Sequence, residues 1–110
     1  MKRRHRLRRS RDFAAVRAAR CGVAGPLLRL QRRGNGLDHP RVGITVAGRL
    51  GGAVARNRLR RQLRALTAQR LARLAAWDLV VIASPAALGA PVGRLGRALD
   101  DGLARLGASR

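Results

Sequence analysis

A dense run of arginines between residues 53 and 64 is the part of the chain best suited to bind another molecule. Five arginines and one asparagine occupy nine consecutive positions. On a helix, Arg56, Arg60 and Arg64 lie one turn apart on a single face. Guanidinium groups form paired hydrogen bonds to phosphate oxygens, so this row is suited to a polyanion. The candidate binding residues on this helix are Arg56, Asn57, Arg58, Arg60, Arg61 and Arg64.

The same run keeps a hydrophobic stripe of Leu59, Leu63 and Leu66, which we expect to be buried. Like charges one turn apart repel each other, and a polyanion lying against them offsets that cost. A solvated cationic face is the alternative interpretation. The sequence favours the polyanion, because no Asp or Glu occurs between Arg41 and Trp77.

The composition also indicates an anionic partner. The chain has 110 residues with a net charge of +20, and its 46% hydrophobic content excludes a disordered basic tail. Nucleic acid is the first candidate partner and an anionic membrane surface the second. We expect a single domain over residues 1–110, in which residues 1–11 form a mobile basic arm that contacts phosphates. The longest uncharged apolar run, 12 residues, is too short to span a bilayer.

The sequence offers no catalytic or metal-binding constellation. Its five carboxylates fall where caps, turns or helix surfaces are expected, and His5 and His39 lack partners at metal-ligand spacing. The single cysteine, Cys21, excludes an internal disulfide and fits a reducing compartment. With Phe13 and Trp77 as its only aromatic residues, the chain does not resemble a base-stacking sheet. We therefore expect no catalytic residue, no bound metal and no small-molecule substrate.

Hydrophobic periodicity predicts the elements that position these residues. Ser10 is a candidate N-cap for the first helix, and the turn residues 34–36 separate two strands that we expect to form a hairpin. A third strand is apolar throughout, as a strand buried on both faces is. The expected elements are a helix at Asp12–Ala19, strands at Leu27–Arg32 and Arg41–Ala47, a helix at Val54–Ala75, a strand at Leu79–Ala83 and an amphipathic helix from Val92.

Four blocks of sequence, taken together, resemble a known family. They are the basic start followed by Asp12-Phe13 and Val16, the strand residues 41–46, the triplet Arg56-Asn57-Arg58 with its arginine-rich continuation, and the apolar run 79–83 followed by Pro85. In this order and spacing they resemble the protein component of bacterial ribonuclease P, whose RNR motif the triplet matches. The resemblance covers nearly the whole chain.

The resemblance implies an α+β fold, a split βαβ sandwich like the second domain of ribosomal protein S5. Its four-stranded sheet carries packed helices in the order α-β-β-β-α-β-α, with a left-handed βαβ crossover where general statistics favour a right-handed one. It also implies a cytoplasmic bacterial subunit that binds ribonuclease P RNA and the 5′ leader of precursor tRNA. In this family the RNA, with Mg²⁺, performs the hydrolysis, and the protein itself binds no cofactor.

Site residues follow from the resemblance position by position. The motif helix faces the catalytic RNA, and the leader lies in a cleft between the first helix and the sheet. The implied cleft residues are Phe13, Val16, Arg17, Arg29 and Thr45. Arg17 and Gln31 stand where the family often has aromatic residues, so we expect fewer stacking contacts and more arginine contacts to phosphates and bases.

Two other functions remain as alternatives. A ribosomal or other structural RNA-binding protein of related fold would share the charge and the order of elements. A membrane-active cationic protein would need an exposed apolar face, whereas the apolar stripes here match a sheet and one another.

Overall fold

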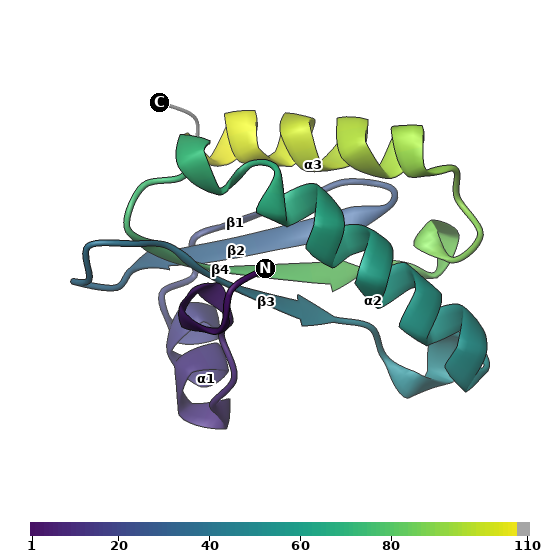
Figure 1. Ribbon diagram of the computed structural model, residues 1–110, viewed down its shortest axis with the longest axis horizontal. Helices are drawn as coiled ribbons and strands as arrows, with labels where there is room; N and C mark the ends of the chain where they lie inside the picture. Colours follow the sequence, from purple (N-terminus) through teal and green to yellow (C-terminus); the bar gives the residue numbers. More distant parts are fainter. Residues whose placement is uncertain (108–110) are drawn as a thin grey trace.

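The computed structural model describes residues 1–107 and has an α+β fold, a mixed four-stranded sheet with three helices (Figure 1). This confirms the predicted α-β-β-β-α-β-α order. The elements are α1 (Ser10–Ala18), β1 (Gly22–Ala24), β2 (Leu28–Gly34), β3 (Arg41–Thr45), α2 (Ala53–Ala68), β4 (Trp77–Ala83) and α3 (Val92–Leu106).

The strands lie in the order β1-β2-β4-β3, with β4 antiparallel to β2 and parallel to β3. The predicted hairpin of β2 and β3 is therefore wrong, because β4 lies between them. Residues 78–81 of β4 are all buried. The strand therefore lies between two other strands, and both faces of the sheet are covered at this point. The connection from β2 to β3 passes the start of β4, where the backbone N–H of Asn35 donates to the Ala76 carbonyl at 3.2 Å.

Two layers of helix cover the sheet unequally (Figure 1). Helices α2 and α3 lie together on one face, and the shorter α1 lies on the other. The main core fills the space under α2 and α3, where Leu63, Leu95 and Leu99 are fully buried. A smaller cluster under α1 joins Leu7, Val16 and Val80. The face that carries α1 is therefore only partly covered.

Three local predictions about these elements need correction. Helix α2 ends at Ala68, not Ala75, because Arg70 leaves helical geometry and its guanidinium donates to the Leu66 carbonyl at 2.8 Å. Ser10 is the first residue of α1, not its cap. Strand β1 was not among the elements that periodicity predicted, since its three residues, Gly22–Ala24, carry a single β-branched side chain.

We predict that Gly102→Ala destabilises the fold. A Cβ at Gly102 would lie 2.4 Å from Cδ1 and 3.1 Å from Cγ of Leu30, so either the buried Leu30 side chain or α3 must shift. The expected cost is about 1–3 kcal/mol of unfolding free energy, measured by urea denaturation. Gly93→Ala on the same helix is the control, because a Cβ there meets no atom within 4 Å. Equal stability of the two variants would contradict this packing.

Candidate nucleic-acid interface

Helix α2 carries Arg56, Arg60 and Arg64 one turn apart along one side, where all three are half-buried. Leu59 and Leu63 are buried against the sheet, and this packing fixes which face of the helix points to solvent. Leu66 is partly buried at the edge of the same core. The outer side then carries Asn57, Arg58 and Arg61, whose side chains are exposed.

Hydrogen bonds within the protein orient two of these arginines. Nε of Arg56 donates to the Gly51 carbonyl at 2.9 Å, and Arg60 donates to Oδ1 of Asn57 at 2.7 Å. A second Arg60 nitrogen donates to the Val46 carbonyl at 3.4 Å. Each guanidinium keeps further N–H groups for an external acceptor, since it carries five donors in all. The row is thus partly pre-oriented for phosphate oxygens.

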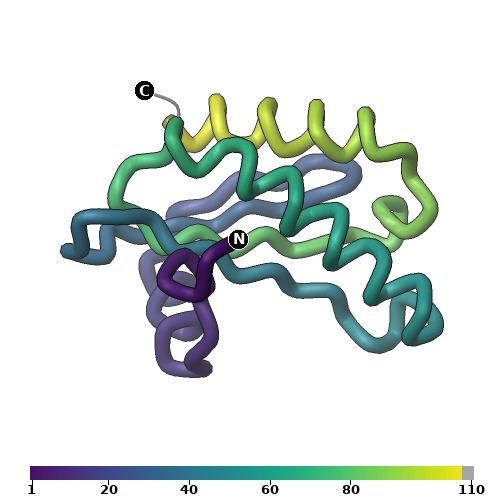
Figure 2. The backbone as a smooth tube through the Cα atoms, in the orientation of Figure 1, coloured from purple at the N-terminus to yellow at the C-terminus, as the bar shows by residue number. Residues whose placement is uncertain are grey.

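The N-terminal segment lies beside β3, at the edge of the sheet (Figure 2). The Leu7 amide donates to the Val42 carbonyl at 2.9 Å, and the Leu7 side chain is buried. His5 Nδ1 lies 2.8 Å from the Pro40 carbonyl oxygen. These contacts anchor the centre of the basic arm on the sheet; that the arm is mobile stays a prediction.

This docking joins the arm to α2. A hollow of about 160 Å³ at the β3 edge is lined by Arg6, Arg8, Phe13 and Arg64. A second hollow of about 590 Å³ lies between the arm and the β2–β3 connection, and it is strongly basic. Its arginines are Arg3, Arg4, Arg6, Arg8, Arg9, Arg11 and Arg41. The positive surface therefore runs from α2 around the β3 edge to the arm.

The predicted cleft residues lie on the α1 face of the sheet. Phe13 rests directly on Gly43, where an added Cβ would lie 2.5 Å from the ring, so only glycine admits the ring so close. Val16 is completely buried and packs in the small cluster with Val80, which fixes α1 on the sheet. Its side chain is therefore part of this core and does not reach the surface, where the prediction of a cleft residue would place it.

The remaining cleft residues stand at the surface beyond α1. Thr45 of β3 and Arg29 of β2 both lie opposite Ile82 of β4, so they flank one position on this face. The Thr45, Arg29 and Arg17 side chains are exposed, and Arg17 projects from the last turn of α1. The structure thus places the predicted residues on the α1 side of the sheet. Phe13 lies where this side meets the arginines of α2, since it lines one hollow together with Arg64.

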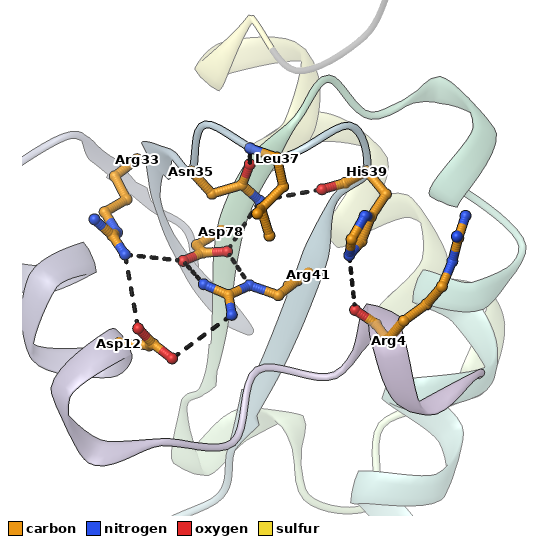
Figure 3. A network of polar contacts seen from close by, with 8 residues as sticks. All are labelled: Arg4, Asp12, Arg33, Asn35, Leu37, His39, Arg41 and Asp78. Carbon is orange, nitrogen blue, oxygen red and sulfur yellow. Dashed lines mark hydrogen bonds and ion pairs between the residues drawn. The ribbon is translucent and has the colours of Figure 1, made fainter.

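A partly buried ion-pair network links α1 to the sheet (Figure 3). The fully buried carboxylate of Asp78 accepts two hydrogen bonds from Arg41 at 2.8 Å each, one from Arg33 at 3.3 Å and one from Asn35 at 3.1 Å. Arg33 and Arg41 also lie 3.8 and 3.7 Å from carboxylate oxygens of Asp12 on α1. Sequence reasoning missed this network; a carboxylate directly before an apolar strand was the only local signal.

Stability should fall in acid because of this network. Burial alone raises the pKa of the Asp78 carboxyl, but hydrogen bonds from Arg41 and Asn35 and the charges of Arg41 and Arg33 lower it below its ordinary value. A folded-state pKa below the unfolded one stabilises the fold above the unfolded pKa of about 4, and this contribution is lost as pH falls through the folded pKa. Urea denaturation from pH 7 to pH 3 at constant ionic strength should show the loss.

The matched control for this pH prediction is the exposed carboxylate of Asp101 on α3. Asp101→Asn should keep the acid dependence, whereas Asp78→Asn should flatten it at a lower overall stability. An unchanged pH profile in Asp78→Asn would show that another group causes the acid loss.

The donor set does not suit a bound metal ion. Among residues 1–107, no three His, Cys, Asp or Glu side chains gather where they would hold one. Asp12, Asp78 and Asp100 face arginines, and Asp38 faces His39. Over the same residues, no helix is long and apolar enough to cross a membrane. What this arrangement can do is bind an extended anion over a large surface.

Comparisons with known proteins agree with this geometry. The profile of the family described as "Ribonuclease P" matches residues 1–107. The ribonuclease P protein component of Acidothermus cellulolyticus is 42% identical over 106 residues, which covers 94% of this chain and 88% of that protein. The Streptomyces griseus protein of the same description is also 42% identical, covering 93% of this chain and 91% of its own.

Solved structures give the same result for the fold. The ribonuclease P protein of Staphylococcus aureus superposes with a TM-score of 0.89 at 26% identity, covering 96% of this chain and 98% of that one. The ribonuclease P protein of Thermotoga maritima gives 0.79 at 26% identity, with 87% and 92% covered.

Proposed function

Because this chain belongs to the bacterial ribonuclease P protein family, we propose that it binds ribonuclease P RNA through α2. Members of this family are the protein component of an endoribonuclease. We also propose that this chain holds the 5′ leader of precursor tRNA. The observation that carries this proposal is the arginine face of α2, which continues around the β3 edge to the basic arm. Such a surface fits a folded RNA, whose phosphates are closely spaced.

In this proposal the RNA subunit is the catalyst. The chemistry that Mg²⁺ would supply, if bound to the RNA, is activation of the attacking water and stabilisation of the leaving group. The side chains of this protein contribute positive charge and shape, and none of them exchanges a proton with the substrate. The protein works with these two RNAs in the bacterial cytoplasm, without a small-molecule substrate or a membrane.

The leader is proposed to cross the α1 face of the sheet. Phe13 offers one stacking surface at the boundary with α2, and the exposed Thr45 hydroxyl offers a hydrogen bond to the strand. Arg17 and Arg29 supply phosphate and base contacts where aromatic rings are absent. The left-handed path of β3, α2 and β4 expected from the family belongs to the same proposal, since the handedness of this crossover decides which face of the sheet α2 covers.

Reconstitution tests the function directly. The purified protein is mixed with a bacterial ribonuclease P RNA and a precursor tRNA that carries a 5′ leader, at low Mg²⁺. The rate of cleavage at the mature 5′ end is then followed. Strong acceleration by the protein is the expected result. Absence of acceleration together with tight binding to ribosomal RNA would favour the structural RNA-binding alternative.

A further inference from the structure

A groove of about 510 Å³ runs between α3 and the turn that joins β1 to β2. It lies at the β1 edge of the sheet, whereas the proposed RNA-binding surface borders β3 at the opposite edge. Nothing in the proposed function uses this groove. A molecule seated in it can therefore bind without displacing RNA from α2.

The floor of the groove is apolar. Leu27 and Leu28 are buried at the end of the turn, and Val23 and Ala98 are half-buried beside them. Among residues 1–107, those that line the groove include no aromatic ring on which a base could stack. Such a floor suits the aliphatic side chains of a protein better than it suits a nucleotide.

Exposed charged side chains of α3 form the rim of this groove. Arg94 and Arg97 lie about one turn apart, and Asp101 follows them one turn later on the same side of the helix. The ion pairs within residues 1–107 include none of these three side chains. A phosphate backbone that followed the rim would be repelled by the Asp101 carboxylate. A peptide can instead place carboxylates at the arginines and an N–H donor at Asp101.

The walls of the groove are held by hydrogen bonds within the protein. The backbone N–H of Gly25 donates to the Leu28 carbonyl at 2.9 Å, which closes the turn, and Pro26 inside the turn has a fixed φ. Nη1 of Arg105 donates to the Ala24 carbonyl at 3.0 Å and ties the far end of the rim to β1. A groove that is formed before binding lowers the entropic cost of docking.

We propose that this groove docks an acidic segment of another protein, with apolar side chains on the floor and carboxylates against Arg94 and Arg97. The length of α3 from Arg94 to Arg105 is about 16 Å, so a helical segment of about three turns would fill the groove. A second copy of this chain is a poor occupant, because its net charge is also +20. The inference goes beyond RNA binding and does not depend on it.

Selection from a displayed library of random peptides tests the inference. The peptides are long enough for about three to four helical turns, and the bait is the full chain with excess transfer RNA, which covers the other arginines. Enriched peptides should combine several carboxylates with large apolar residues. Synthetic, fluorescein-labelled copies then give the Kd by fluorescence anisotropy.

Charge reversal locates the binding site. Arg94→Glu combined with Arg97→Glu should weaken binding of the selected peptides at least about tenfold, because like charges then face each other. Arg58→Glu combined with Arg61→Glu, at exposed positions on α2, changes the net charge equally and should leave the Kd unchanged. Replacing the apolar residues of a selected peptide by serine should also remove binding. Circular dichroism confirms that each variant is folded.

Several results would overturn the inference. One is a library that yields no acidic peptides with apolar residues, and another is equal loss of binding, or none, in the two charge-reversed variants. A serine-substituted peptide that keeps its affinity would show that charge alone holds it. Two other occupants would be recognised directly. A lipid would appear as binding to phosphatidylglycerol vesicles that only the α3 variant loses, and a second copy as a dimer in analytical ultracentrifugation that the α3 variant dissociates.

Discussion

Changing Arg56, Arg60 and Arg64 together to alanine should remove most of the affinity for ribonuclease P RNA. Each phosphate contact of an arginine contributes on the order of 1 kcal/mol, so the three together amount to about 3 kcal/mol, or roughly 100-fold in affinity. The slope of log affinity against log salt should become shallower by about 2–3. Filter binding over a salt series measures both quantities, and cleavage at low Mg²⁺ should lose the acceleration by the protein.

A second triple variant separates position from net charge. Arg94→Ala, Arg97→Ala and Arg105→Ala remove the same charge from exposed positions on α3. This variant should retain nearly all of the affinity and the acceleration. Equal losses in the two triple variants would mean that binding follows total charge and that α2 is not the RNA-binding face.

Asp78→Ala should cause the largest loss of stability of any single change considered. Asp78 is fully buried and accepts hydrogen bonds from Arg33, Asn35 and Arg41. Removing the carboxylate leaves two guanidinium groups without their main counter-charge at the start of β4. Breaking a buried ion pair in this way costs about 3–5 kcal/mol, measured as the unfolding free energy in urea.

Asp101→Ala, which removes an exposed carboxylate from α3, is the matched control and should change stability by no more than about 0.5 kcal/mol. The double variant Asp78→Ala with Arg41→Ala should recover part of the loss, because it removes one of the stranded charges. A loss below about 1 kcal/mol for Asp78→Ala would show that Asp12 and solvent replace its role.

Local periodicity was sufficient to predict the type and position of α2, α3 and β4, although not the residue at which α2 ends. The leucines of α2 and α3 recur at three- and four-residue spacing, and β4 is apolar on both faces, so local burial determines each element. Which strands pair is a non-local property that no short window contains. The two turn residues Asn35 and Gly36 signalled a chain reversal correctly, but the reversal leads around β4, not into a hairpin.

The binding surface was also predictable only in part. The arginine row follows from its spacing and from the buried leucines on the opposite side of α2. The burial of Leu7 could not be predicted, because a single leucine within a run of arginines forms no periodic pattern. The contact of Phe13 with Gly43 joins residues 30 positions apart and depends on the final packing of α1.

The docked N-terminal segment also has a consequence for solubility. An open sheet ends in strands with unpaired backbone groups, which attract strands of other molecules and start aggregation. Here one edge is the three-residue β1, whose Ala24 carbonyl accepts a hydrogen bond from Arg105 at 3.0 Å. The other edge, β3, is occupied at Val42 by the Leu7 amide and bordered by arginines of the arm. These contacts protect both edges of the sheet from edge-to-edge association, and at β3 the protection comes from the arm that borders the proposed RNA-binding surface.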